Sequence, residues 1–145
     1  FLGALGNFRN GALVVRALDY ALSGPLRPQE IFTIPRELAD DEELKDTSWN
    51  WLKRNHGAIV QRIPPFYLAN LPHFAGCCTD QRIEDAQYFF SRPETNHPGT
   101  QEELAKVRDS IHDCAGLRER EGQVVARYMT EMAQARRAPG AAPGR

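Results

Sequence analysis

Apolar residues recur with a period close to 3.6 along most of the chain, whereas alternating apolar and polar positions are rare. Because β-branched residues are also scattered, the pattern predicts helices and no sheet. The segments with the helical period are 13–22, 28–34, 44–54, 58–63, 66–74, 83–90, 104–117 and 124–132. We therefore predict an all-α fold of about seven or eight short helices.

Local signals place the ends of several of these helices. Pro28 suits the first position of a helix, and Pro35 is expected to end or kink that helix within one turn. Thr100 followed by Glu103 has the spacing of a capping box at the start of the longest periodic stretch. The segment Gly116–Gly122 predicts a break that divides this stretch into two helices.

The succession of short helices also predicts the architecture. Antiparallel helices that each bury one face are typical of an α-solenoid, a superhelix of stacked helix pairs, although the sequence has no fixed-period repeat. We predict one helical domain over residues 1–134 and a flexible tail over 135–145. Phe1, Leu2 and Leu5 before Gly6 resemble the last turn of a helix that begins upstream. We expect a fragment of a larger chain, and a ragged end left by proteolysis is the alternative.

Composition and charge exclude several classes of protein. Of the 145 residues, 41% are hydrophobic and 26% are charged, which excludes disorder over the whole length. Eighteen basic and nineteen acidic residues give a net charge of −1, so there is no overall attraction for nucleic acid or an anionic membrane. The apolar runs are far shorter than the roughly 20 residues that span a bilayer. We predict no nucleic-acid partner and no membrane partner.

Motifs for metal binding and catalysis are missing from the sequence, which has no His-Glu-x-x-His, no paired Cys-x-x-Cys and no glycine-rich phosphate loop. His73 with Cys77, and His112 with Cys114, are only weak zinc-ligand pairs. We therefore predict no catalytic residue, no metal ligand and no cofactor in this chain. Adjacent Cys77 and Cys78 could bond to each other only in a strained geometry. We expect free thiols, which favours a reducing compartment such as the cytoplasm.

Four short motifs occur in an order that resembles a known family. They are the apolar helix Ala17–Leu22, the Leu-Arg-Pro-Gln-Glu segment Leu26–Glu30, the Trp-Asn-Trp-Leu-Lys-Arg-Asn segment Trp49–Asn55, and Phe89–Phe90 before a Pro/Gly loop and two final helices. This order resembles the C-terminal helical domain of M1-family zinc aminopeptidases, of the puromycin-sensitive and membrane alanyl type. The resemblance covers most of Phe1–Met132 and implies a superhelix of HEAT-like helix pairs.

The resemblance also implies a function for a larger protein. In the family, a His-Glu-x-x-His motif and a downstream Glu bind zinc, and a Gly-x-Met-Glu-Asn segment holds the substrate amine; neither occurs in this chain. The resemblance therefore implies a non-catalytic domain whose zinc lies elsewhere in the parent enzyme. Its implied partners are the upstream catalytic domain of the same polypeptide and the peptide substrate. Its implied role is to enclose the catalytic cavity and to contact the distal part of the peptide.

Seven candidate residues follow from the resemblance, as family-motif positions or as possible contacts in the substrate cavity. They are Arg27, Gln29, Glu30, Trp49, Trp51, Asn55 and Asn70. Glu30 stands where relatives commonly have Asp, and Asn70 lies near a position that is basic in many of them. A structural role is the alternative, with the polar residues capping or bridging helices and the tryptophans packing between layers.

A second hypothesis comes from a different class of protein. The chain could be a free-standing helical-repeat module that binds a protein partner through its concave face. Such a module needs a polar outer face on its terminal repeat. The apolar residues Phe1, Leu2 and Leu5 instead favour the aminopeptidase domain.

Overall fold

The computed structural model describes residues 1–137, which form helices joined by short turns. The elements are α1 (Leu2–Leu5), α2 (Gly11–Ser23), the 3₁₀ helix η1 (Pro28–Glu30), α3 (Thr33–Ala39), α4 (Lys45–Arg62), the 3₁₀ helix η2 (Pro65–Ala75), α5 (Asp80–Phe90) and α6 (Thr100–Arg137). No strand occurs within the described residues, so the all-α prediction is confirmed. None of these helices is both long and apolar enough to cross a membrane.

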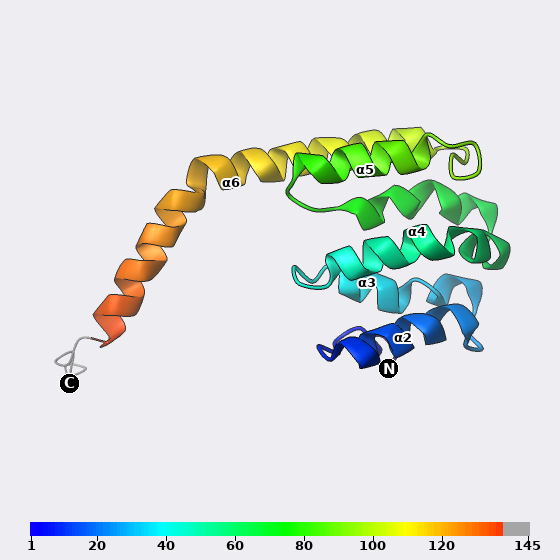
Figure 1. Ribbon diagram of the computed structural model, residues 1–145, viewed down its shortest axis with the longest axis horizontal. Coiled ribbons are helices and arrows are strands. Elements are labelled where there is room, and N and C mark those ends of the chain that lie inside the picture. Colours follow the sequence, from blue (N-terminus) through cyan, green and yellow to red (C-terminus); the bar gives the residue numbers. More distant parts are fainter. Residues whose placement is uncertain (138–145) are drawn as a thin grey trace.

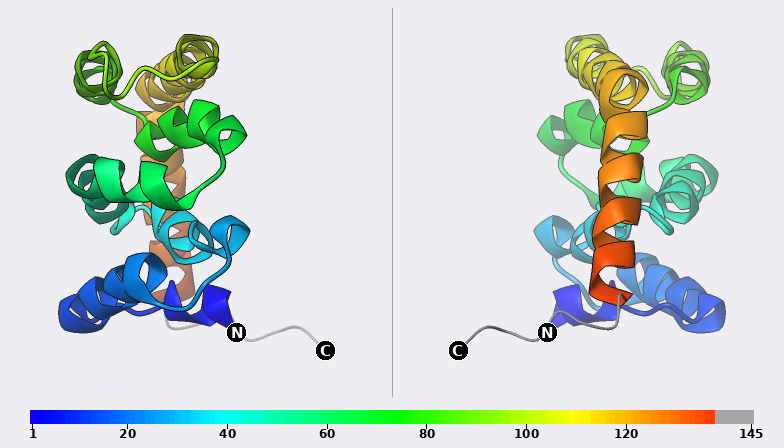
Figure 2. Two further views of the ribbon diagram at one scale, coloured as in Figure 1. Left: turned by 90° about the vertical axis from the view of Figure 1, so that its right-hand side faces the viewer. Right: turned by 90° about the vertical axis from the view of Figure 1, so that its left-hand side faces the viewer.

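The helices form a stack from the N-terminal end to α5 and α6, in which successive helices alternate between two columns (Figures 1 and 2). One column contains α2, α4 and α5, and the other contains α1, α3, η2 and the first half of α6. This is an arrangement of stacked helix pairs, and the HEAT-like character of the pairs remains a prediction.

A continuous apolar core fills the space between the two columns. It begins at Val14 in α2 and ends at Ile111 in α6. The largest side chains that are fully buried in it are Trp49, Phe90, Ile31, Ile34, Leu38, Leu52, Ile59 and Leu71. The helices α2, α3, α4, η2, α5 and α6 all contribute to this core, so the stack folds as one unit.

The ends of several helices are set by a capping side chain or by glycine and proline, as these residue types predict. Asn10 caps α2, because its side-chain oxygen accepts hydrogen bonds from the backbone N–H groups of Ala12 (3.0 Å) and Leu13 (3.3 Å). The helix ends at Ser23, directly before Gly24 and Pro25, as predicted. The 3₁₀ helix η2 starts at Pro65. A proline is tolerated there because the N–H of the first helical residue has no partner within the helix.

Two expected helix boundaries are wrong. The separate helices expected at 44–54 and 58–63 are one continuous α4, because burial of His56 and Ile59 on either side of Gly57 outweighs the helix cost of that glycine. Pro35 does not end its helix: it is the third residue of α3, where its missing N–H would have had no partner within the helix.

The capping box expected at Thr100 and Glu103 is also absent. Thr100 is the first residue of α6, and its hydroxyl accepts a hydrogen bond from the backbone N–H of His97 (3.1 Å). The Glu103 carboxylate instead contacts His73 Nε2 (3.0 Å) and Lys106 Nζ (2.6 Å). Contacts of Glu103 with His73 of η2 and with Lys106 therefore replace the local cap.

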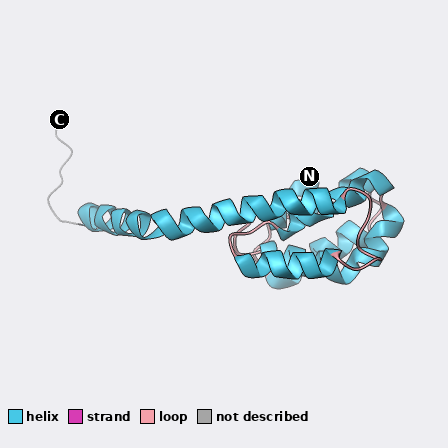
Figure 3. Ribbon diagram, turned by 90° about the horizontal axis from the view of Figure 1, so that it is seen from above, coloured by secondary structure: helices cyan, strands magenta, loops and turns pink. Residues whose placement is uncertain are grey.

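The long helix α6 is continuous through Gly116–Gly122, so the predicted break is wrong. The helix instead bends in the region of these glycines and then extends beyond the stack, after a first half that lies beside α5 (Figures 1 and 3). We call residues 117–137 distal α6. Its exposed apolar side chains are Leu117, Val124, Val125, Tyr128, Met129 and Met132. Of the predicted tail, residues 135–137 are the end of this helix and 138–145 lie outside the described residues.

Replacement of Gly57 by alanine should stabilise the domain. Gly57 is exposed within α4, and a Cβ atom built there meets nothing within 4 Å. Alanine should raise the free energy of unfolding by about 0.5–1 kcal/mol, since it restricts the unfolded backbone and favours the helix. Urea denaturation followed by circular dichroism measures this change. As a contrasting variant, Gly6→Ala should destabilise, because its Cβ would overlap that of Glu37.

Candidate functional site

A polar cavity of about 590 Å³ opens on one edge of the stack. Its walls come from the first halves of α4 and α5, the connector between η2 and α5, and Arg118 of α6. Because these segments are distant in sequence, the cavity depends on the stacking of the helices. Trp49 is the member of the seven candidate residues that lines it.

Trp49 lies at the centre of a cluster of charged side chains. Its indole N–H donates a hydrogen bond to Asp85 Oδ2 (2.6 Å), and Lys53 Nζ donates to the same oxygen (2.6 Å). Lys53 Nζ lies 5.2 Å from the centre of the indole ring, and the Arg82 guanidinium lies 5.9 Å from it. Arg82 also pairs with Asp46. The indole therefore holds two cations and a carboxylate in fixed positions.

The balance of charges keeps Asp85 ionised. Burial raises the pKa of this carboxyl, but hydrogen bonds from Lys53 and Trp49, with the positive charges of Lys53 and Arg82, outweigh that effect and lower the pKa below its usual value. One guanidinium nitrogen of Arg82, Nη1, is buried and has no hydrogen-bond partner within the described residues. These groups offer electrostatic recognition of a charged group.

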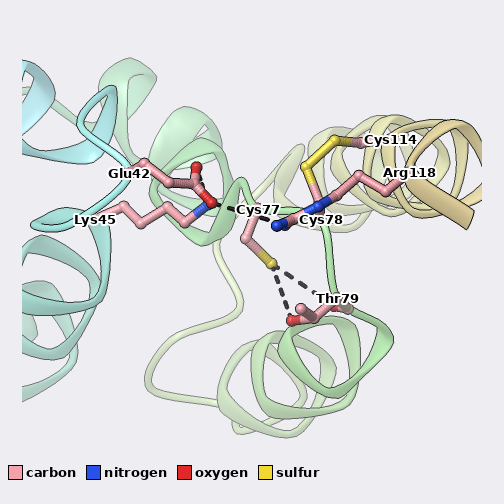
Figure 4. Close-up of a disulfide and its surroundings, with 7 residues drawn as sticks. All are labelled: Glu42, Lys45, Cys77, Cys78, Thr79, Cys114 and Arg118. Carbon is pink, nitrogen blue, oxygen red and sulfur yellow. Dashed lines mark hydrogen bonds and ion pairs between the residues drawn. A yellow bond between two sulfur atoms is a disulfide. The ribbon is translucent and has the colours of Figure 1, made fainter. Parts of the chain in front are cut away.

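The rim of the cavity carries further ion pairs (Figure 4). Glu42 contacts Lys45 Nζ (2.6 Å) and Arg118 Nη1 (3.7 Å), which links α6 to the segment before α4. These side chains are largely exposed, apart from that of Lys45, and exposed pairs contribute little to stability. Their main effect is therefore on the charge at the mouth of the cavity, and they add little to the stability of the fold.

A disulfide also borders the cavity (Figure 4). Cys78 is bonded to Cys114 of α6, with Cα atoms 5.1 Å apart, whereas Cys77 is free. The expectation of free thiols is therefore wrong for two of the three cysteines. Cys77 and Cys78 do not bond to each other; the stacking of α6 beside the connector instead brings Cys114 to Cys78 across a sequence separation of 36 residues. The preference for a reducing compartment loses its basis.

Three of the predicted site residues lie in or beside η1, away from the cavity. Arg27 Nη2 pairs with Glu30 Oε1 (2.6 Å), and the backbone N–H of Arg27 donates to the other oxygen of Glu30 (2.9 Å). This pairing lowers the pKa of Glu30. Gln29 is exposed between them. This arrangement is typical of the start of a helix. It favours the alternative in which these residues have a structural role and cap helices.

The predicted residues of α4 are mostly in the core. Trp49 is 1% exposed and Trp51 is 4% exposed, so both tryptophans are buried in the core. Asn55 is half-buried, and its side-chain N–H group donates to the backbone carbonyl of Trp51 (2.9 Å). These positions favour packing roles for Trp51 and Asn55.

Asn70 lies in a different hollow. It is exposed on η2 and lines a space of about 300 Å³ together with Arg36, Asp40 and His73. The seven predicted residues are therefore spread over η1, α4 and η2 and do not form one site.

Sequence reasoning missed the residues that build the cluster at Trp49. Lys53 is one helical turn after Trp49, a spacing that could have indicated it. Arg82 and Asp85 both lie more than 30 residues after Trp49, and nothing local marks them as partners of the indole. Within residues 1–137, no three His, Cys, Asp or Glu side chains come together as metal ligands.

Comparison with known proteins identifies the domain. Residues 1–113 match the ERAP1-like C-terminal domain. The chain belongs to this family. The predicted resemblance to the C-terminal domain of M1-family aminopeptidases is thereby confirmed. Residues 114–137, which include distal α6, lie outside the matched range of the ERAP1-like domain.

Two relatives from Saccharomyces cerevisiae agree with this assignment. The chain is 29% identical over 134 residues to "Aminopeptidase 2, mitochondrial" and 26% identical over 138 residues to "Alanine/arginine aminopeptidase". Each alignment covers 90% of this chain but only 14% and 15% of the respective relative. The chain therefore corresponds to a small part of the length of these enzymes. No solved structure matches the chain.

Proposed function

We propose that this chain is the non-catalytic domain of a zinc aminopeptidase and that its helical stack encloses the catalytic cavity of the parent enzyme. The match of residues 1–113 to a C-terminal domain family carries this proposal. The chain has no His-Glu-x-x-His motif, so the zinc ligands and the general base would belong to the upstream catalytic domain of the same polypeptide.

The exposed members of the seven predicted residues are the ones available for contact with a peptide. Asn70 lines a hollow in which Arg36, Asp40 and His73 offer both charges and hydrogen bonds. Trp49 and Trp51 are buried and would act through packing. We therefore assign contact with the distal part of the peptide to the Asn70 hollow, because its charged and hydrogen-bonding side chains are open to a ligand.

Substitution of Asn70 by tryptophan in the full-length parent enzyme tests this assignment. The bulky side chain should fill the hollow and lower kcat/KM for a peptide of about ten residues by about fivefold or more. It should leave kcat/KM for an aminoacyl anilide within about twofold, because the anilide occupies only the zinc site.

Gln61→Trp is the matched control, since Gln61 is exposed on α4 and outside this hollow. It should change neither rate. Equal losses for the long and short substrates with Asn70→Trp, or no loss for either, would overturn the assignment of peptide contact to this hollow.

A further inference from the structure

The three cysteines lie together at the point where α6 leaves the stack (Figure 4). Cys78, in the connector between η2 and α5, is bonded to Cys114 in α6. The free Cys77 thiol lies 3.5 Å from the hydroxyl of Thr79. Cys77 and Cys78 line the polar cavity, which is open to solvent. A small thiol reagent can therefore approach the bonded pair from the cavity.

The disulfide is the last strong attachment of α6 to the stack. Within the described part of the chain, Ile111 is the last buried residue of α6. The ion pairs that follow it are His112 with Asp80 (3.2 Å) and Arg118 with Glu42 (3.7 Å), and all four side chains are more than half exposed. Ion pairs this exposed are weak and are screened by salt. Beyond Ile111, the covalent bond is thus the main attachment between α6 and the rest of the stack.

The first half of α6 has a separate anchor. Leu104, Val107 and Ile111 are buried against the rest of the stack, and they do not depend on the disulfide for their burial. Loss of the bond should therefore release the part of α6 beyond Ile111 while the stack stays folded. The buried first half of α6 is a stable anchor, and the part beyond Ile111 is restrained by a bond that can be broken. A reversible switch needs both.

We propose that Cys78–Cys114 is a redox switch that fixes the direction of α6 when oxidised and releases it when reduced by a dithiol. One thiolate of the dithiol attacks one sulfur of the bond, forms a mixed disulfide and displaces the other cysteine as a thiolate. The second thiol of the dithiol then displaces the first cysteine. The dithiol is oxidised to its own disulfide, and Cys78 and Cys114 are reduced to two thiols.

Release changes two surfaces at once. Arg118 leaves the wall of the polar cavity, and the exposed apolar side chains of distal α6 change their position relative to the stack. The side chains of residues 117–136 are exposed and the Arg118–Glu42 ion pair is weak, so the disulfide is the main restraint on the position of these surfaces. The switch would thereby couple the redox state to the shape of the cavity mouth. The inference does not depend on the proposed role in peptide hydrolysis.

Thiol alkylation and hydrogen exchange of the 145-residue chain test the switch. Mass spectrometry after alkylation should show one modified cysteine before treatment with dithiothreitol and three after it. On reduction, backbone amides of residues 76–80 and 112–118 should exchange at least about tenfold faster, because their opening no longer has to strain a covalent link. Amides of α2 and α4 should keep their exchange rates.

Two variants separate the bonded pair from its neighbour. Cys77→Ser should keep the disulfide and show the same response to dithiothreitol. Cys114→Ser should exchange rapidly at 76–80 and 112–118 with or without the reductant. Three modified cysteines without reductant, or unchanged exchange after reduction, would overturn the proposal. Faster exchange throughout α2–α5 would also overturn it, since the bond would then support the whole domain.

Discussion

Replacement of Trp49 by alanine should lower the free energy of unfolding by about 3–5 kcal/mol. Trp49 is 1% exposed, and its ring centre lies 5.6 Å from that of Phe89 and 5.9 Å from that of Phe90. Alanine would remove these aromatic contacts and leave a cavity in the core. It would also remove the indole N–H that donates to Asp85. Urea denaturation followed by circular dichroism measures the loss.

Trp49→Phe separates packing from hydrogen bonding. Phenylalanine keeps much of the aromatic volume but cannot donate to Asp85, whose carboxylate is still paired with Lys53. The expected loss is therefore smaller, about 1–2 kcal/mol. If Trp49→Ala cost less than about 1 kcal/mol, the buried position of this indole would be contradicted.

The helices could be predicted largely from periodicity, because each one buries a single face. The errors at Gly57 and Glu103 arise because packing overrides a local signal, whereas the error at Pro35 concerns its position within the helix. Gly57 lies within a helix because the side chains next to it are held in the core. Pro35 is tolerated because it falls in the first turn of α3. The Thr100 hydroxyl turns back to His97, and Glu103 pairs with His73 of the neighbouring helix.

The candidate site was less accessible to prediction because its parts meet only after the helices stack. Trp49 could be singled out as a large aromatic in a family motif, but its partner Asp85 is 36 residues away. The Cys78–Cys114 bond spans the same separation. Such pairs follow from the order in which helices stack, and a single sequence carries no local trace of that order.

The domain should lose stability as the pH falls from about 6.5 toward 4, because of one buried histidine. His56 is 7% exposed and lies against the edge of Phe89, and its ring stacks on that of His97 with centres 5.3 Å apart. Burial lowers the pKa of His56 from 6.5 to about 4, and the nearby His97 and Arg92 add to this effect against an opposing contribution from Glu94.

The direction of the pH effect follows from the number of protons that the unfolded and folded chains bind. Between pH 6.5 and 4 the unfolded chain binds a proton at His56 that the folded domain does not bind, so acidification favours unfolding. The contribution is fully present above pH 6.5 and is lost as the pH falls. The loss of stability should amount to about 2 kcal/mol at pH 5 and about 3 kcal/mol near pH 4, at 1.36 kcal/mol for each unit of pKa difference.

Urea denaturation at pH 7 and pH 5 checks this prediction, and His56→Phe is the variant that isolates it. Phenylalanine suits the apolar side of the site and cannot titrate, so the loss between the two pH values should shrink by about 2 kcal/mol, whatever the stability of the variant at pH 7. The lowered pKa of Asp85 acts mainly at lower pH and does not mimic the effect. His112→Gln, a change at an exposed histidine, should leave the loss in place because His56 remains. If His56→Phe lost as much stability between pH 7 and pH 5 as the unchanged chain, other groups would be the cause of the sensitivity to acid.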